Sequence, residues 1–306
     1  MKVHALVTGG AGFIGSHIVD RLLADGYRVR VLDDFSTGKR ENLPDSADLE
    51  IVTGDVGSFE DVHKAMQDVE LVFHEAAIAS VPKTIEDPIG SHRTNYQGTL
   101  NVLEAARQHG AKRVVFASSA AVYGDLPDLP KREDMPLKPL SPYAVDKLAS
   151  EYACQMYTHL HDLETVCLRY FNVYGPRQDP GSPYSGVISI FADRLKKGKR
   201  PVIYGDGEQT RDFVFVSDVV EANMKAATSG SAVGRVINIA TGGVVTLNEL
   251  LKSMCRILNR KFDPAYEKVR VGDIRHSSAL ASLSKEALDW RAIVDMDEGL
   301  DILLNA

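Results

Sequence analysis

Short apolar runs alternate with longer segments of helical spacing from residue 3 to residue 168. The runs are rich in Val, Ile and Leu and are followed by turn residues, so they predict buried strands at residues 3–7, 28–32, 49–53, 71–74, 113–117 and 165–168. Between them, apolar residues recur every three or four positions, as in residues 13–24, and predict helices. This alternation is typical of an α/β fold with a doubly wound parallel sheet.

The regular alternation fades after Arg169. The remaining segments predict short strands at residues 201–204, 213–216 and 236–239, and helices at residues 187–197, 219–228, 247–258 and 297–304. We therefore expect a sheet domain over residues 1–172 and a smaller substrate-binding α/β region over residues 173–306. Two long loops are expected at residues 36–48 and 125–141, and such loops at strand ends usually carry binding or chemistry.

A glycine turn joins the first predicted strand to the first predicted helix. The sequence Thr-Gly-Gly-Ala-Gly-Phe-Ile-Gly places Gly9, Gly12 and Gly15 where a backbone must turn tightly and admit a pyrophosphate to a helix N-terminus. Glycines also close turns for structural reasons alone. Here, however, the second strand ends in Asp33, the acidic residue expected for a ribose hydroxyl, and Asp34 follows it. Both acids would repel a 2′-phosphate, so the pattern favours NAD over NADP.

Composition narrows the class of protein. The 306 residues are 44% hydrophobic and 25% charged, as in an ordinary globular chain, and the net charge of −7 argues against nucleic acid as a partner. Three cysteines without metal-ligand spacing predict free thiols and no metal site. The first strand begins by residue 3, which leaves no room for a leader, and no apolar run is long enough for a membrane span. We expect a cytoplasmic protein with no membrane partner.

Tyr143 and Lys147 are the strongest candidates for acid–base chemistry. They stand four residues apart at the start of a predicted helix, after Ser141 and Pro142, so both side chains leave one helix face. A neighbouring ammonium favours the phenolate, and the pair would take a proton from a hydroxyl while hydride leaves the same carbon. A Tyr and a Lys on a helix surface are the simpler alternative. Ser119, at the end of a predicted strand, either binds the reacting oxygen or satisfies its own backbone.

Five motifs occur in order along the chain: Gly-Gly-Ala-Gly-Phe-Ile-Gly, His-Glu-Ala-Ala from His74, Ser-Ser-Ala-Ala-Val-Tyr-Gly from Ser118, Tyr-Ala-Val-Asp-Lys from Tyr143, and Arg-Tyr-Phe-Asn-Val-Tyr-Gly from Arg169. Together they resemble the extended short-chain dehydrogenase/reductase superfamily, and within it the UDP-glucose/UDP-galactose 4-epimerase branch. The resemblance extends to about Ser277.

The resemblance implies a function for each motif residue. Ser119 would be the catalytic hydroxyl, Tyr143 the base and Lys147 the residue that binds the nicotinamide ribose. The implied cofactor-binding residues are Gly9, Gly12, Phe13, Ile14, Gly15, Asp33, Asp55, Val56, Ala76, Ala77, Asn95, Tyr143, Lys147 and Tyr170. The implied residues for a UDP-sugar substrate are Ser119, Tyr143, Asn172, Val187, Tyr204, Arg211, Arg270, Asp273 and Ser277.

The arginine assignment has independent physical support, because a diphosphate bound by an acidic protein needs fixed planar donors. Arg211 has an alternative, a surface ion pair with Asp212 or Glu208. Arg270 is followed by Val271, where relatives usually carry proline, so its match is weaker.

The resemblance also indicates which reaction to expect, because acidic residues found in other enzymes of the superfamily are absent from this chain. Dehydratases of the superfamily carry an Asp-Glu pair after the catalytic hydroxyl and decarboxylases a Glu, whereas this chain has Ala120 and Ala121. The expected reaction is 4-epimerisation of UDP-glucose and UDP-galactose, through oxidation at C4, rotation of the 4-keto sugar and hydride return. Ser277 is small at the position of a gatekeeper, which predicts acceptance of UDP-N-acetylglucosamine and UDP-N-acetylgalactosamine.

Two alternatives remain open on the sequence. A UDP-glucuronate 4-epimerase would share nearly every residue named, and a non-catalytic NAD-binding regulatory protein would share the fold but usually lacks the Tyr/Lys pair. The helices expected at residues 94–108 and 144–161 are apolar on more than one face, and in the resembling family they form a dimer bundle. A homodimer is therefore expected, with packing inside one chain as the alternative.

Overall fold

A seven-stranded parallel sheet forms the centre of the molecule. The computed structural model describes residues 2–179, 186–269 and 274–305. The strand order is β11-β6-β5-β4-β1-β2-β3, and every neighbouring pair is parallel. The strands are β1 (His4–Thr8), β2 (Arg28–Asp33), β3 (Leu49–Thr53), β4 (Leu71–His74), β5 (Arg113–Ser119), β6 (Glu164–Tyr170) and β11 (Val236–Ile239). The predicted doubly wound α/β fold is confirmed.

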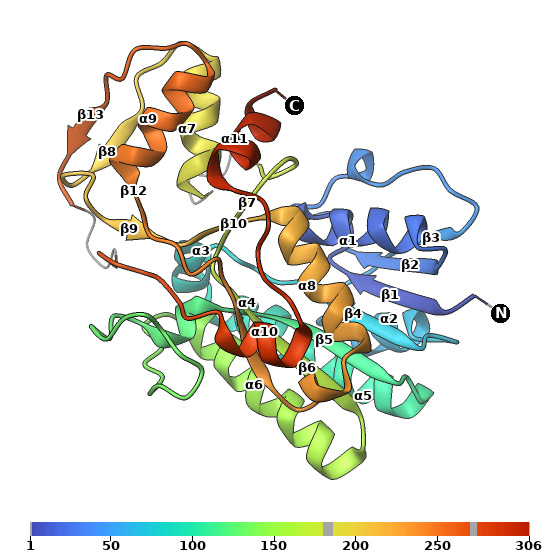
Figure 1. The fold of residues 1–306 in the computed structure, drawn as a ribbon. Helices are drawn as coiled ribbons and strands as arrows, with labels where there is room; N and C mark the ends of the chain where they lie inside the picture. Colours follow the sequence, from blue (N-terminus) through green and yellow to red (C-terminus); the bar gives the residue numbers. More distant parts are fainter. Residues whose placement is uncertain (1, 180–185, 270–273, 306) are drawn as a thin grey trace.

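Helices cover both faces of this sheet (Figure 1). One face carries α1 (Phe13–Ala24) and α8 (Val216–Thr228), and the other carries α2 (Phe59–Ala65), α5 (Gly98–His109) and α6 (Pro142–His161). The apolar spacing explains the burial: Ile18, Val19 and Leu22 of α1 are spaced for one helix face and are fully buried against the sheet. The strands are apolar on both faces for the same reason, because helices pack on each side.

The residues after β6 form a smaller lobe, drawn at the upper left of Figure 1, and also return to the sheet. The lobe contains α7 (Val187–Lys196), α9 (Leu247–Ile257) and α11 (Met296–Asn305), which share a third apolar core. Its strands pair in twos: β7 (Asn172–Tyr174) with β10 (Phe213–Phe215), β8 (Val202–Tyr204) with β13 (Ala265–Glu267), and β9 (Thr210–Arg211) with β12 (Val245–Thr246). Both β11 and α8 lie beyond the expected division at residue 172 and pack with the sheet, and that division stays a prediction.

Several short elements join the larger ones. Between β4 and α5 the chain forms α3 (Val81–Glu86), α4 (Pro88–His92) and a π-helical turn, η2 (Arg93–Gln97), that continues into α5. The remaining ones are the 3-10 turns η1 (Arg40–Asn42), η3 (Ala120–Tyr123) and η4 (Gly230–Ala232), and the helix α10 (Ser282–Leu288). The expected loop at residues 125–141 is held to the lobe because Lys131 exchanges backbone hydrogen bonds with Ser278 and Leu280.

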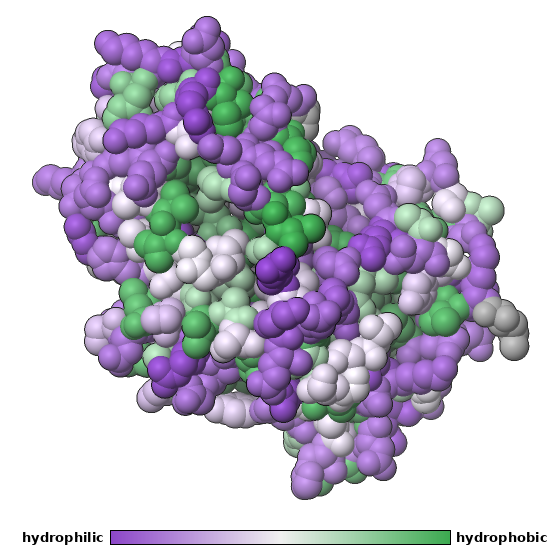
Figure 2. All heavy atoms as spheres, in the orientation of Figure 1, coloured by the Kyte–Doolittle hydropathy of each residue, from purple (hydrophilic) through white to green (hydrophobic). Residues whose placement is uncertain are grey.

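Figure 2 shows a hollow between the lobe and the sheet, with apolar side chains gathered in it and polar ones around its rim. The hollow lies above the carboxyl ends of the parallel strands, where ligands of open α/β sheets bind. Within the described ranges, no helix has both the length and the apolar character that crossing a membrane requires.

Candidate active site

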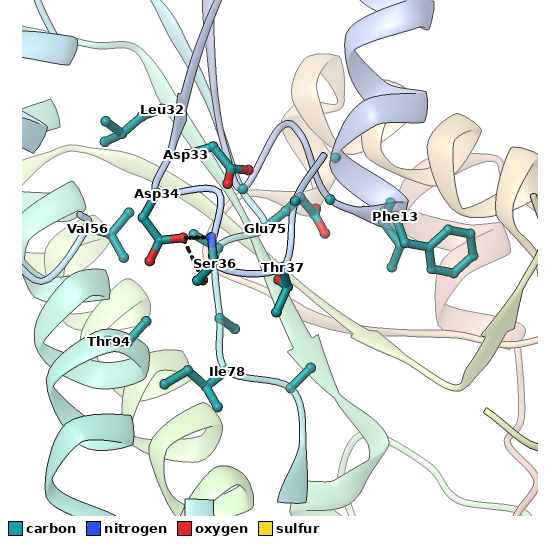
Figure 3. Close-up of a pocket in the computed structure, with 18 of the residues that line it drawn as sticks. Phe13, Leu32, Asp33, Asp34, Ser36, Thr37, Val56, Glu75, Ile78 and Thr94 are labelled. Carbon is teal, nitrogen blue, oxygen red and sulfur yellow. Dashed lines mark hydrogen bonds between the residues drawn. The ribbon is translucent and has the colours of Figure 1, made fainter. Parts of the chain in front are cut away.

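A cavity of about 460 Å³ opens at the carboxyl ends of β1, β2, β3 and β4 (Figure 3). Its wall contains most of the residues expected to hold a dinucleotide, namely Gly9, Gly12, Phe13, Ile14, Gly15, Asp33, Val56, Ala76 and Ala77. Much of the remaining wall is formed by Asp34, Ser36, Thr37, Glu75, Ile78 and Thr94. The sheet therefore brings together one set of residues from four strand ends that lie far apart in sequence.

The glycine turn has no room for side chains. Gly9 has a φ of +68°, and a Cβ there would lie 2.7 Å from the backbone nitrogen of Ala76. A Cβ on Gly15 would lie 2.2 Å from the Gly9 carbonyl oxygen. No side chain caps α1 at Gly12, and the residues from Gly12 to Gly15 at its start line the cavity, as an anion site at a helix N-terminus would require. This cradle fits the pyrophosphate of a dinucleotide.

Asp33 is buried beside this turn, with 7% of its surface exposed. Its carboxylate accepts hydrogen bonds from the amides of Ala11 and Phe35, each at 2.9 Å. Burial raises the pKa of Asp33, and these two hydrogen bonds act in the opposite direction. Asp34 is exposed at the cavity mouth, where its carboxylate accepts from the amide and hydroxyl of Ser36 (Figure 3). Two acids at this edge fit an unphosphorylated ribose.

Two of the expected cofactor residues, Asn95 and Asp55, hydrogen-bond to other residues around the cavity. The Asn95 side chain accepts from the amide of Ile78 at 2.8 Å and donates to its carbonyl at 3.3 Å. Asp55 accepts from the amide of Gly57 and from Arg93. The expected contacts of Asn95 and Asp55 with a cofactor stay predictions, whereas their hydrogen bonds fix the loops that line the cavity.

The Ser119, Tyr143 and Lys147 side chains converge. Tyr143 lies in the first turn of α6, which Ser141 caps by accepting from the amide of Ala144. The Tyr143 hydroxyl lies next to the Ser119 side chain at the end of β5, close enough for Ser119 to lower its pKa. Lys147, one turn later, places its Nζ 5.8 Å from the centre of the Tyr143 ring and donates to the Ala117 carbonyl at 2.6 Å. The expected helix face therefore exists and points to the expected strand end.

Burial governs the electrostatics of this trio. It raises the pKa of Tyr143, while the Ser119 side chain lowers that pKa and the Glu75 charge raises it further. Burial also lowers the pKa of Lys147 to about 8. The chain alone thus favours the neutral phenol of Tyr143, and positive charge bound beside it would favour the phenolate.

Glu75 was not assigned any function from the sequence, yet it lies at the centre of the cavity wall. The Tyr170 hydroxyl donates to Glu75 Oε1 at 2.9 Å, and Asn223 Nδ2 donates to the Tyr170 oxygen at 2.7 Å. Burial raises the pKa of Glu75 to about 7. One signal could have pointed to it, an ionisable residue inside the His-Glu-Ala-Ala motif, but its partner Tyr170 is 95 residues away.

A buried polar network behind the trio was also missed. Glu151 of α6 accepts from Ser118 Oγ at 2.5 Å and forms a two-point ion pair with Arg169 of β6, both contacts at 2.8 Å. Glu151, Ser118 and Arg169 are each at most 3% exposed. This network joins β5, α6 and β6 directly behind the ends that carry Ser119 and Tyr143.

Apart from Ser119 and Tyr143, the expected substrate residues that the structure describes lie on segments of the lobe. Asn172 donates from its amide and its side chain to the Asp212 carbonyl, which places it beside Arg211. Ser277 donates its backbone N–H to the Thr210 carbonyl, on the other side of Arg211. Val187 begins α7 and Tyr204 ends β8, both half-buried. Arg270 and Asp273 lie outside the described residues.

Asp212 explains why these segments meet. It is fully buried, and its carboxylate accepts from the amide and hydroxyl of Thr241 and from the amide of Gly242. Thus Asp212 does not serve as a surface ion pair for Arg211. Arg211 Nη1 donates to the carbonyls of Thr210 and Arg275, which orients its guanidinium along β9.

Comparison with known proteins gives the same picture. A model of the NAD dependent epimerase/dehydratase family matches residues 5–240. A putative UDP-glucose 4-epimerase of Methanocaldococcus jannaschii is 41% identical over 302 residues, covering 98% of this chain and 97% of that protein. Two solved structures are similar over nearly the whole chain. One is the UDP-glucose 4-epimerase of Thermus thermophilus in complex with NAD, at a TM-score of 0.90 and 39% identity, covering 99% of this chain and 98% of the other. The second is the UDP-N-acetylglucosamine 4-epimerase of Methanobrevibacter ruminantium in complex with UDP-N-acetylmuramic acid. Its TM-score is 0.95 and its identity 39%, and the match covers 100% of this chain and 98% of the other.

The fold and the cavity define an enzyme that binds a nicotinamide dinucleotide on a doubly wound sheet. The chain belongs to the NAD dependent epimerase/dehydratase family. Its cofactor is NAD, and its enzyme class is an isomerase of the 4-epimerase type. The predictions of family, cofactor and enzyme class are thereby confirmed.

Proposed function

We propose that this chain is a 4-epimerase of UDP-hexoses that interconverts UDP-glucose and UDP-galactose and also accepts their N-acetylated counterparts. The observation that carries the proposal is the convergence of Ser119, Tyr143 and Lys147 beside the dinucleotide cavity. The two residues after Ser119 are Ala120 and Ala121, which supply no acid to expel water. Such a site oxidises and reduces a carbon without elimination.

Each residue of the trio has a distinct task in this proposal. Bound NAD supplies a reversible acceptor for the hydride on sugar C4. Tyr143 removes the proton of the C4 hydroxyl and later returns it, and Ser119 holds the C4 oxygen by a hydrogen bond. Lys147 contributes positive charge that favours the phenolate, and its anchor to the Ala117 carbonyl fixes its distance from the ring.

The nucleotide is bound by the lobe in this proposal. Arg211 meets the diphosphate, because its planar guanidinium provides charge-assisted hydrogen bonds in an acidic protein. Arg270 is proposed as a second arginine for the diphosphate, and Asp273 as the acceptor for a ribose or amide hydrogen. Asn172, Val187 and Tyr204 would contact the remainder of the UDP-sugar. Anchoring by the nucleotide leaves the sugar free to turn and present its other face after oxidation.

Ser277 sets the size limit for the sugar. It lies beside Arg211 on the segment that hydrogen-bonds to Thr210, and its small side chain leaves room for a 2-acetamido group. The similarity to a UDP-N-acetylglucosamine 4-epimerase supports this proposal. We predict that Ser277→Tyr lowers kcat/KM for UDP-N-acetylglucosamine by about tenfold or more and changes that for UDP-glucose much less, since only the larger sugar clashes. Equal losses on both substrates would contradict the size limit.

We also propose a cytoplasmic homodimer. Val145, Tyr152, Met156 and Leu160 of α6 are exposed apolar residues on one side of the helix, next to α5. Burying this face against a second copy would remove it from water. Cys154, Cys167 and Cys255 are buried free thiols, in keeping with a reducing compartment. Light scattering of the chain and of Tyr152→Glu tests the dimer, which the new charge is expected to weaken.

The deciding experiment incubates the purified holoenzyme with UDP-glucose, UDP-N-acetylglucosamine and UDP-glucuronate separately and resolves the products. Interconversion of gluco and galacto forms of the first two is expected. Turnover of UDP-glucuronate alone would replace the proposal by the uronate alternative. No turnover of any sugar, with NAD bound, would favour a regulatory protein.

A further inference from the structure

Glu75 is the ionisable residue of the cavity that the proposed reaction leaves without a task. It follows β4 directly and lies on the cavity wall beside the glycine turn (Figure 3). One carboxylate oxygen accepts from the Tyr170 hydroxyl at 2.9 Å. No residue in the described ranges donates a hydrogen bond to the other oxygen, which leaves it available to a ligand.

The position of Glu75 is between the two parts of the site that a dinucleotide must join. Its backbone carbonyl carbon would lie 3.1 Å from a Cβ on Gly9, at the turn that suits the pyrophosphate. Its charge also acts on Tyr143 and Lys147, where the reacting ring must be. A cofactor that reaches from the turn to Tyr143 therefore passes this carboxylate.

The charge balance of the site needs such an anion. The oxidised nicotinamide ring is positive, and Lys147 is a buried ammonium in the same space. Two like charges in a site of low dielectric repel strongly, and each favours the loss of the other. The groups that face Glu75 are Tyr143 and Lys147 from α6 and Tyr170 from β6. Among these, Lys147 is the cation, and Tyr143 is negative only when it has lost its proton as the base. Glu75 is therefore the counter-charge whenever Tyr143 is the neutral phenol, and positive charge bound beside Glu75 favours its ionised form.

We propose that Glu75 sets the redox balance of the bound cofactor: its carboxylate, held by Tyr170, stabilises the oxidised, positively charged nicotinamide over the reduced, neutral one. This inference rests on the NAD-dependent function proposed above. Its consequence is that the enzyme rests in the oxidised form between turnovers. Without Glu75, the equilibrium on the enzyme between bound sugar with oxidised cofactor and bound 4-keto sugar with reduced cofactor would shift toward the reduced cofactor.

The test uses the purified holoenzyme without any sugar nucleotide. Wild type, Glu75→Gln, Glu75→Asp and the control Glu60→Gln are equilibrated with a two-electron redox dye couple, and bound reduced nicotinamide is read from its near-ultraviolet absorbance. Glu60→Gln makes the same chemical change as Glu75→Gln, but it does so at an exposed residue of α2 that pairs with Lys64. Glu75→Gln keeps the shape and the acceptor for Tyr170 but removes the charge.

We expect the ratio of reduced to oxidised cofactor to rise roughly tenfold in Glu75→Gln, as loss of one nearby charge predicts. Glu75→Asp, which keeps the charge, and Glu60→Gln should stay near wild type. A wild-type ratio in Glu75→Gln would overturn the inference, and so would an equal rise in Glu75→Asp, which would point to shape rather than charge. If Glu75→Gln fails to fold, Glu75→Ala takes its place as the variant without the charge, and a ratio in Glu75→Ala equal to that in Glu75→Asp would overturn the inference. Wild-type protein that binds no NAD would instead overturn the proposed function.

Discussion

The cofactor half and the nucleotide-sugar half of the site are fixed by different means. In the cofactor half, Gly9 and Gly15 occupy places where any Cβ would overlap backbone atoms, and Asp33 is buried with its oxygens bonded to amides. In the other half, Arg211 and Ser277 are half-buried and lie on a two-residue strand and the segment bridged to it. The first half is determined by backbone sterics, whereas the second is determined by a few side chains. The cofactor half should therefore tolerate fewer substitutions than the nucleotide-sugar half.

The trio between the two halves should give the largest effect. Tyr143→Phe removes the hydroxyl that takes the proton but leaves the ring, α6 and both binding halves in place. We expect kcat to fall by about a thousandfold or more, within the range for loss of a general base, with little change in the Kd of a UDP-sugar. Rapid-quench kinetics and isothermal titration measure the two quantities. Normal turnover would contradict the assignment of the base.

The cofactor half should be intolerant of one methyl group. In Gly15→Ala, the new Cβ would lie 2.2 Å from the Gly9 carbonyl oxygen, so the turn must shift. We expect NAD affinity to fall about a hundredfold and the free energy of unfolding to drop by about 2 kcal/mol. Gly230→Ala is the matched control, because a Cβ there meets nothing within 4 Å. Fluorescence titration with NAD and chemical denaturation measure both effects; wild-type NAD affinity in Gly15→Ala would show that the turn is not sterically fixed.

The nucleotide-sugar half should be weakened without loss of the cofactor. Arg211→Ala removes a guanidinium that the proposed function places on the diphosphate, and we expect KM for UDP-glucose to rise by about thirtyfold while NAD retention stays unchanged. Arg256→Ala is a control on α9, since Arg256 is exposed and pairs with Asp297. Loss of NAD together with substrate affinity in Arg211→Ala would mean that the two halves form one unit, which would break the comparison.

The effect that is smallest near neutral pH concerns the pH dependence of the cofactor half. His74 is buried at the end of β4, with its ring nitrogens next to the hydroxyls of Thr8 and Thr99, and burial lowers its pKa from 6.5 to about 3. The folded state stays unprotonated there, while the unfolded state binds a proton below pH 6.5. The contribution of His74 to the free energy of unfolding is therefore fully present above pH 6.5. It is lost as the pH falls toward 3, with a slope of up to about 1.4 kcal/mol per pH unit.

The glutamine side chain of His74→Gln is neutral at every pH. Comparing this variant with wild type therefore isolates the contribution of His74 to the free energy of unfolding. Urea denaturation of both proteins at a series of pH values should show a steeper acid loss in wild type than in the variant. Parallel curves would mean that His74 is protonated in the folded state, and that its environment is more open than the structure shows.

The long local patterns of this chain were sufficient to predict its fold. The helix α1 and the strands β3 and β4 have the predicted ends, because each carries its own apolar period and turn residues. The helix α8 begins at Val216, three residues before the predicted start, because the short strand β10 leads directly into it. The strands β7, β9, β12 and β13 were missed, since two or three residues hold no period and their pairing depends on distant partners.

The same limit applies to the site. The glycine turn and the Tyr143/Lys147 pair are local patterns, so the sequence predicted them and the structure brings the pair to Ser119. Three buried acids were missed because only their contacts with other elements show that they belong to the site. These contacts are Glu75 with Tyr170, Glu151 with Arg169 and Asp212 with Thr241. Polar contacts across long sequence separations leave no periodic signal, and they account for what was missed.

The seventh strand has a consequence for how the protein is made. Because β11 pairs with β6, a ribosome must synthesise the chain beyond Ile239 before the sheet is closed on that side. A fragment that ends at residue 172 would leave the buried strand β6 as an exposed edge, with its backbone N–H and carbonyl groups open to other chains. Such a fragment should aggregate during expression, whereas in one that continues through β11 the seven-residue strand β6 is covered and the shorter, four-residue β11 forms the edge.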